Sequence, residues 1–326
     1  MRKWYIGKAD AIREKHEAIL VTSKKDWTHF THDFKTGDEI FLQRVAFGSS
    51  LPEFFSVTEP LREDVGEWLS VQPALRYVEL HAADACNLNC RACSHFAPLF
   101  PKQAYSEVAQ ILQDVKELNR LFPYVRHIRI LGGEPLLNPH ILDVVTGIRQ
   151  LYRESRLSIV TNGLLLEKLG REFADILVEN RAELMITCYP PIKSVVKAAA
   201  ERFRSWNVPT FVSPETAYFH LFLKEKGESG FSSCTIKGCY FLRNGTLWRC
   251  ALSALIGVYN NAFSMKFPTE QGIRLTEHEN AFSVLSKLSH EGKLCYYCQD
   301  DGYLMPWMTT TSPAAEDWIH GTKEHE

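Results

Sequence analysis

Residues 76–93 read RYVELHAADACNLNCRAC and join a strand-like segment to a cysteine-rich loop. Residues 76–81 have the length and the apolar content of a strand. They are followed by a Cys-x3-Cys-x2-Cys run made of Cys86, Cys90 and Cys93. Three thiolates on so short a loop can hold three corners of an iron–sulfur cubane and leave one iron without a protein ligand. A zinc site whose fourth ligand is distant, such as His95, is the alternative use of the same thiolates.

The segment at residues 76–81 begins a regular alternation of strands and helices. Apolar runs predict strands at residues 76–81, 127–131, 157–161, 184–188 and 208–212. Apolar side chains at three- and four-residue spacing predict helices at residues 108–121, from 141 after Pro139, at 167–180 and at 193–206. Such alternation predicts an α/β fold with parallel strands, in either an open sheet or a partial or complete barrel.

Distinctive motifs follow three more of these strands, at the end where chemistry is expected in parallel sheets. They are Gly132-Gly133-Glu134-Pro135 after the second strand, Thr161-Asn162-Gly163 after the third, and Cys188 at the end of the fourth. Glycine has no Cβ and therefore allows a close approach of the backbone to a ligand. The motifs are expected to meet at one edge of the sheet.

The cysteine loop and these motifs together resemble the radical S-adenosylmethionine (SAM) superfamily over residues 75–212. The resemblance implies a partial (β/α)6 TIM-like barrel and a [4Fe–4S] cluster held by Cys86, Cys90 and Cys93, whose open iron binds the amino and carboxylate groups of SAM. It also implies a set of cofactor-binding residues. These are Gly132 and Gly133 beside the methionine part, Glu134 near its ammonium group, and Pro135, Thr161 and Asn162.

A second cysteine group lies in the last third of the chain and has five members: Cys234, Cys239, Cys250, Cys295 and Cys298. Its Gly245-x4-Cys250 segment, with a turn dipeptide between strand-like residues, predicts a hairpin. The group resembles the twitch auxiliary domain of radical SAM enzymes, which binds one additional [4Fe–4S] cluster, whereas a SPASM domain needs more cysteines. Either Cys234 or Cys239 is spare if four ligands suffice. A zinc ribbon is the alternative reading.

These patterns divide the chain into four parts. They are an α+β extension at residues 1–72, with a helix at 9–20 and a strand at 39–47; the radical SAM partial barrel at 73–230; a loop-rich auxiliary cluster domain at 231–310; and a polar, mobile tail at 311–326. The extension suggests no chemistry of its own.

Composition excludes several classes of protein. Lys and Arg number 37 and Asp and Glu number 39, so a net charge of −2 provides no basic field for nucleic acid. No apolar run approaches the ~20 residues that span a bilayer, and no signal-peptide segment follows the first residues. We therefore expect a cytoplasmic protein whose nine cysteines are metal ligands or catalytic groups rather than disulfides.

The resemblance implies reductive cleavage of SAM to a 5′-deoxyadenosyl radical, which abstracts hydrogen from a substrate, with electrons from a flavodoxin or ferredoxin. Two outcomes remain open: oxidation of an alcohol through the auxiliary cluster, as in an oxidoreductase, or epimerisation, as in an isomerase. Cys188 is a candidate hydrogen-atom donor for epimerisation, and a small buried core residue is its alternative role. Because one auxiliary cluster is indicated, we expect a small carbohydrate- or aminocyclitol-like substrate.

Two other functions are compatible with the sequence. One is a SPASM-like maturase that modifies a ribosomal peptide, with residues 1–70 as a peptide-docking module. The other is a non-catalytic metal-binding protein. Neither nucleic acid nor a membrane is an expected partner in any of these readings.

Overall fold

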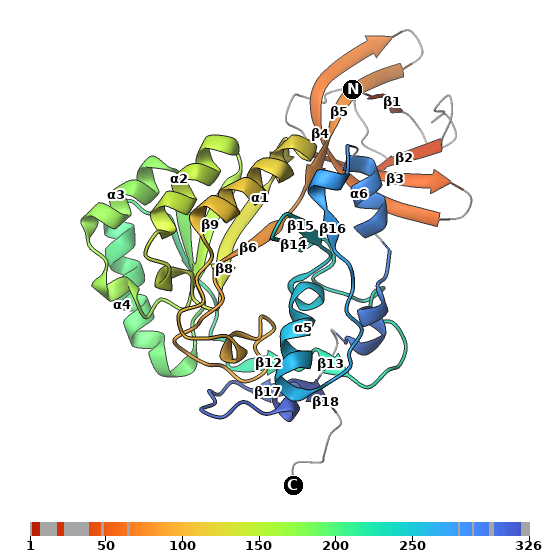
Figure 1. The fold of residues 1–326 in the computed structure, drawn as a ribbon. Coiled ribbons are helices and arrows are strands. Elements are labelled where there is room, and N and C mark those ends of the chain that lie inside the picture. Colours follow the sequence, from red (N-terminus) through yellow and green to blue (C-terminus); the bar gives the residue numbers. More distant parts are fainter. Residues whose placement is uncertain are drawn as a thin grey trace.

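The computed structural model describes residues 2–6, 18–22, 39–46, 49–63, 66–279, 281–288, 290–299 and 303–320, with most side chains from residue 74 onward. In Figure 1 a central sheet has helices on its left and the C-terminal region on its right, and the N-terminal strands lie at the upper right. Within the described residues, no helix is both long and apolar enough to cross a membrane.

The central sheet has the strand order β11-β10-β9-β8-β6-β14-β15-β16. Five of its strands are parallel and follow chain order from the centre to one edge: β6 (Val78–Ala83), β8 (His127–Gly132), β9 (Arg156–Thr161), β10 (Ala182–Ile186) and β11 (Thr210–Val212). The crossover helices are α1 (Val108–Leu121), α2 (Ile141–Leu151), α3 (Arg171–Glu179) and α4 (Lys193–Ser205). The strand and helix predictions for residues 76–212 are confirmed, with boundaries within a few residues.

The helices cover one face of this sheet because each presents an apolar stripe to it (Figure 1). In α1 the stripe consists of Ile111, Val115, Leu118 and Leu121, all buried. The apolar residues at every second position of the strands, such as Ile128 and Ile130, belong to the same core. Gly147 of α2 lies so close to Leu112 of α1 that a Cβ would come within 2.5 Å of that leucine.

The sheet contains six parallel strands. The resemblance implied that the sixth would continue the series of strand–helix repeats, but it lies at the other side of the sheet. Strand β14 (Tyr240–Arg243) pairs in parallel with β6, at the opposite side from β8. The chain reaches it from β11 through residues 213–239, which contain the two short strands β12 (Tyr218–His220) and β13 (Leu223–Lys224) and no α-helix. The partial barrel is therefore completed by the first strand of the C-terminal region.

The C-terminal region begins with the predicted hairpin, which the structure confirms. Strand β14 pairs antiparallel with β15 (Thr246–Trp248), and the turn residues Asn244 and Gly245 have φ of 51° and 70°. Positive φ at both positions is the requirement of a tight two-residue hairpin turn. The remaining elements are α5 (Ala251–Phe263), β16 (Ile273–Arg274), α6 (Ala281–Leu288), β17 (Leu304–Pro306) and β18 (Ile319–His320), with short 3-10 turns between them.

Residues 311–320 differ from the predicted polar tail. Trp318 and Ile319 are buried in a second core with Tyr259 of α5 and Phe96, and β18 pairs with β13. The sequence did not reveal this because a single aromatic–aliphatic pair among polar residues has no periodicity. Residues 321–326 of the predicted tail lie outside the described residues.

The described parts of the N-terminal extension are strands. They form an antiparallel sheet of order β1-β5-β4-β3-β2, comprising β1 (Arg2–Ile6), β2 (Ala18–Thr22), β3 (Glu39–Ala46), β4 (Ser49–Glu63) and β5 (Gly66–Leu75). Strand β5 also pairs with β7 (Tyr124–Val125). The predicted strand at 39–47 is confirmed over its described residues. The helix predicted at 9–20 is wrong for residues 18–20, which pair with β3, and its residues 9–17 lie outside the described residues.

Candidate functional site

A cavity of about 190 Å³ lies at the carboxyl ends of β8, β9 and β10, beside the loop that follows β6. The three cysteines of that loop line it, together with Gly132, Gly133, Asn162 and Tyr189. The structure therefore brings together the motifs that the sequence predicted to meet at this edge.

Two residues of the cysteine loop have a left-handed backbone conformation, which strands and right-handed helices do not have. Asn89 and Ala92 have φ of 51° and 54°, in the left-handed region. Asparagine tolerates this region, whereas alanine adopts it at a cost of about 1 kcal/mol or more. Among the described residues no three His, Cys, Asp or Glu side chains lie close enough to share a single metal ion.

Burial controls the chemistry of the three thiols. It raises the pKa of Cys86 to about 12, that of Cys90 to about 12, and also that of Cys93. Hydrogen-bond donors oppose the shift, since Trp307 Nε1 donates to Cys90 Sγ at 3.2 Å and Leu88 N donates to Cys86 Sγ at 3.5 Å. Three buried thiols with donors aimed at their sulfurs need a cationic centre to ionise, which an iron–sulfur cluster provides. The donor set fits the predicted group.

Gly132 and Gly133 are required where β8 passes the end of β6. A Cβ on Gly132, which has φ of +153°, would lie 1.8 Å from the Ala83 carbonyl oxygen, and one on Gly133 would lie 2.3 Å from that of Ala85. The amides of Gly133 and Glu134 donate to the same two carbonyls, at 2.9 and 2.8 Å. The glycines thus hold the cysteine loop against β8, in addition to bordering the cavity.

Glu134 is the residue for which the resemblance implied a contact with the SAM ammonium group, and that contact stays a prediction. Its side chain is fully buried and does not line the cavity. It accepts hydrogen bonds from Leu136 N, Thr161 Oγ1 and Asn162 N at 3.1, 2.7 and 2.8 Å. Burial raises the pKa of this carboxyl to about 7, against the effect of these donors. The carboxyl group of Glu134 therefore joins the end of β8 to the end of β9.

The other predicted cofactor residues, Pro135, Thr161 and Asn162, lie beside Glu134 at the ends of β8 and β9. Pro135 is buried and begins a short 3-10 turn. Asn162 Nδ2 donates to Asn87 Oδ1 at 2.7 Å, which links the end of β9 to the cysteine loop. Thr161 and Asn162 also line the cavity. Their placement agrees with the predicted contact with SAM, which stays a prediction.

Cys188 is buried in the main hydrophobic core, and it does not line the cavity. Its neighbours Thr187 and Tyr189 do line it. Because side chains alternate along an extended segment, the thiol points to the helix-covered side of the sheet. This position favours the core role over the predicted role as hydrogen-atom donor.

A buried polar chain borders the site on the β14 side. Arg243 donates to both oxygens of Asp84 at 2.7 Å, Asp84 pairs with His81 Nδ1 at 2.7 Å, and His81 Nε2 lies 2.8 Å from His95 Nδ1. Burial lowers the pKa of His81 to about 4 and keeps its imidazole neutral. His81 thus engages one ring nitrogen of His95, whose side chain belongs to the residues that line the cavity.

The second cysteine group surrounds a cavity of about 260 Å³ in the C-terminal region. Four cysteines line it: Cys234, Cys250, Cys295 and Cys298. Cys239 does not, although its thiol is near enough to Cys234 and Cys250 for their charges to act on it. The geometry therefore favours Cys234 over Cys239 as the fourth ligand.

The N-terminus of α5 favours the ionised form of Cys250. Cys250 is the N-cap of α5 and accepts Ser253 N at 3.4 Å, where the helix dipole stabilises negative charge. Burial nevertheless raises the pKa of Cys250 to about 11. The side chains of Lys237 and Arg249 also line the cavity. Four thiols around a cavity with nearby cations fit a metal cluster.

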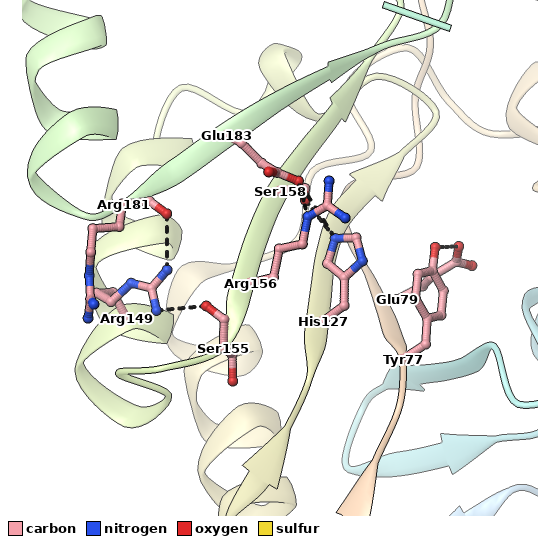
Figure 2. A network of polar contacts seen from close by, with 9 residues as sticks. All are labelled: Tyr77, Glu79, His127, Arg149, Ser155, Arg156, Ser158, Arg181 and Glu183. Carbon is pink, nitrogen blue, oxygen red and sulfur yellow. Dashed lines mark hydrogen bonds and ion pairs between the residues drawn. The ribbon is translucent and has the colours of Figure 1, made fainter. Parts of the chain in front are cut away.

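Polar side chains occupy the face of the sheet that the helices leave uncovered, and Figure 2 shows them. His127 donates from Nε2 to Ser158 at 2.7 Å, Ser158 donates to Glu183 at 2.5 Å, and Arg156 donates to the same carboxylate at 2.7 Å. Tyr77 donates to Glu79 at 2.6 Å. The charges of Glu79 and Arg129 act on the Cys239 thiol, so this polar face extends toward the second cysteine group.

Two functional candidates escaped prediction from the sequence. Asn87 lies between the first two cysteines and bonds Asn162, and a side-chain amide at that position is a signal that could have been noticed. Trp307 is more than 200 residues from Cys90 in sequence, and no local pattern connects them.

The sequence model described as the Radical SAM superfamily matches residues 81–206. Over 100 residues the chain is 35% identical to GTP 3′,8-cyclase of Limosilactobacillus fermentum, covering 29% of each chain. Over 97 residues it is 37% identical to molybdenum cofactor biosynthesis protein 1 of Bos taurus, covering 28% of this chain and 15% of that one. The chain thus spans less than a third of the length of these curated relatives.

Solved structures to which the chain is similar include BtrN in complex with AdoMet and 2-DOIA, at 15% identity and a TM-score of 0.41, covering 70% of this chain and 94% of that one. Another is anSMEcpe with bound AdoMet and the Cp18Cys peptide, at 22% identity and a TM-score of 0.32, covering 43% and 42%. The family match falls on the strands, cysteine loop and cavity described above. Residues 81–206 therefore match the radical SAM superfamily, whose members use a [4Fe–4S] cluster and SAM.

Proposed function

We propose that this protein is a radical SAM enzyme that abstracts a hydrogen atom from a small polar, carbohydrate- or aminocyclitol-like substrate. The observation that carries the proposal is the single cavity lined by Cys86, Cys90, Cys93 and the two glycines that end β8. A cluster bound there, together with SAM, supplies a 5′-deoxyadenosyl radical. The three thiols would hold the cluster, and the backbone at Gly132–Gly133 would lie beside the methionine part.

The polar face of the sheet supports a small polar substrate. It carries Glu79, Arg129 and Glu183 among its charged side chains, and the first two act on the Cys239 thiol of the second cysteine group. Hydroxyl and amino groups of a substrate would find donors and acceptors there, and the sheet and the C-terminal region would exclude water from the reacting carbon.

Oxidation is favoured over epimerisation. The four cysteines Cys234, Cys250, Cys295 and Cys298 would hold a second [4Fe–4S] cluster, which supplies an electron acceptor when bound. Among the described residues that line the SAM cavity, no thiol remains besides the three proposed ligands. An epimerase needs a hydrogen-atom donor at the substrate, and the buried position of Cys188 argues against that residue as the donor.

A nucleotide is the second candidate substrate, because the sequence relatives are named GTP 3′,8-cyclase. The likeness to them covers the radical SAM domain alone. Triphosphates are usually bound by several Arg or Lys side chains. The polar face carries Arg129 and Arg156, so a nucleotide stays the second candidate and the assay below separates the two.

The test is an anaerobic assay of reconstituted protein with SAM and a strong reductant, against aminocyclitols, sugars, GTP and short peptides. The proposal predicts 5′-deoxyadenosine in stoichiometric relation to an oxidised aminocyclitol or sugar, with deuterium transfer from the substrate carbon to 5′-deoxyadenosine. Stimulation by GTP alone would establish the second candidate. Failure to cleave SAM under any condition would refute both.

A solvent-isotope experiment separates oxidation from epimerisation. In heavy water the oxidised product gains no deuterium at carbon, and Cys188→Ala leaves the yield unchanged. Deuterium at the carbon, lost on Cys188→Ala, would restore the epimerase reading.

A further inference from the structure

The C-terminal strap, defined here as residues 307–318, lies against the cysteine loop along its length. Arg91 N donates to Met308 O at 2.9 Å, and Thr310 N donates to Asn89 O at 2.9 Å. Cys90 and Thr309 form an antiparallel bridge between these two bonds. A segment far away in sequence thus behaves as a short strand paired with the predicted cluster loop.

Trp307 is the one residue of the strap whose side chain donates to a predicted ligand sulfur in the described structure. Its Nε1 lies 3.2 Å from Cys90 Sγ. The ring stacks on Tyr189, with centroids 5.0 Å apart and planes 22° from parallel, and its own backbone N donates to Ala217 O at 2.8 Å. The indole N–H is therefore held in place by contacts on two sides.

We infer that Trp307 is a positioning residue that sets the reduction potential of the cluster on Cys86, Cys90 and Cys93 through its hydrogen bond to the Cys90 sulfur. The inference rests on the proposed function. Reduction adds one electron from the donor protein to the cluster and neither forms nor breaks a bond. Because the added charge is shared by the ligand sulfurs, an N–H donor at one of them stabilises the reduced state.

The same strap contains a matched control. Trp318 Nε1 donates at 2.9 Å to the backbone oxygen of Cys93 and not to its sulfur. Both tryptophans thus anchor the loop through an indole N–H, yet only one bond reaches a predicted ligand atom. A structural role would be shared by the two, whereas an effect on the potential belongs to Trp307.

The experiment is a redox titration of the reconstituted full-length protein, followed by electron paramagnetic resonance on the cluster signal that changes when SAM is added. Trp307→Phe keeps an aromatic ring and removes the N–H. We expect its cluster to be reduced about tenfold less readily than that of wild type, a negative shift of about 59 mV for a one-electron couple. Trp318→Phe is expected to keep the wild-type potential. Iron content and thermal unfolding verify that each variant is folded and loaded.

A second measurement needs no substitution in the reference protein. Wild type labelled with ¹⁵N in its indole rings should show a hyperfine coupling to the reduced, SAM-responsive cluster, which Trp307→Phe loses and Trp318→Phe keeps. An unchanged potential in Trp307→Phe, equal shifts in both variants, or no such coupling in wild type would overturn the inference. A cluster signal that never responds to SAM would instead refute the proposed function, and the inference with it.

Discussion

The two cysteine groups of this protein are built in opposite ways. The first occupies eight consecutive residues on one loop after β6, and its geometry is set by local backbone turns and by the glycines of β8. The second is assembled from three separate segments: the loop before β14, the N-cap of α5 and the short turn at Lys293–Tyr297 with the residue after it. A ligand set on one loop can be predicted from spacing, whereas a ligand set assembled by folding leaves its members ambiguous.

The surroundings of the two groups differ as well. The first is buttressed by a fully buried carboxylate and by the C-terminal strap. The second lies beside cationic side chains and a helix N-terminus. We therefore expect damage to the first group to abolish SAM cleavage and damage to the second to affect a later step.

The largest expected effect is that of Cys93→Ala, which removes one of three proposed ligands. Production of 5′-deoxyadenosine should fall by at least about 100-fold, because the open iron that binds SAM would be lost. Cys298→Ala should retain detectable SAM cleavage. The measurement is chromatographic quantification of 5′-deoxyadenosine under anaerobic conditions. Equal loss in both variants would break the distinction between the two groups.

Iron content distinguishes Cys234 from Cys239 as the fourth ligand of the second group. Cys234→Ser should lower the iron of reconstituted protein from about eight to about four atoms per chain, whereas Cys239→Ser should leave it near eight. The physical reason is that Cys234 lines the auxiliary cavity and Cys239 does not. Colorimetric iron and sulfide determination tests this. The reverse pattern would make Cys239 the ligand.

Backbone packing beside each group offers a third comparison. Gly132→Ala should lower the free energy of unfolding by about 3 kcal/mol or more, because its Cβ would overlap the Ala83 carbonyl. Gly257→Ala in α5, next to the second group, meets nothing within 4 Å and should stabilise by up to about 1 kcal/mol. Chemical unfolding followed by circular dichroism measures both. A tolerated Gly132→Ala would show that β8 can move away from the cysteine loop.

The last comparison concerns the pH dependence of stability that Glu134 gives to the first group. Burial raises the pKa of this carboxyl to about 7, so between about pH 4.5 and 7 the folded protein keeps a proton that the unfolded chain has lost. The free energy of unfolding should therefore fall as pH rises through this window, by up to about 3 kcal/mol, and Glu134→Gln should remove that contribution.

Thr161→Val is the companion variant, because Thr161 Oγ1 donates to Glu134 and lowers its pKa. Without this donor the window should extend to higher pH. Unfolding curves at pH 5, 6, 7 and 8 for the three proteins measure the slopes. Parallel slopes in wild type and Glu134→Gln would mean that Glu134 does not titrate in this range.

Two side chains have surroundings that their motifs do not reveal. Glu134 is expected near the SAM ammonium group from its place in a motif, and two of the three donors to its carboxyl group, Thr161 and Asn162, come from the end of β9 and the residue after it. Cys188 ends a strand at the correct edge of the sheet, but the alternation of side chains turns it toward the helices. A shift of one residue moves a side chain to the other face of the sheet, and a strand boundary predicted from apolar content is not accurate to one residue.

The alternation of strands and helices, the Cys-x3-Cys-x2-Cys loop and the hairpin at Asn244-Gly245 were determined by the sequence alone, because each depends on side chains within a few residues of one another. Only the tertiary structure decided that β14 joins the sheet beside β6, that Cys234 and not Cys239 faces the auxiliary cavity, and that Trp307 reaches Cys90. Those contacts join segments far apart in the chain, and their geometry is set by the packing of the whole fold.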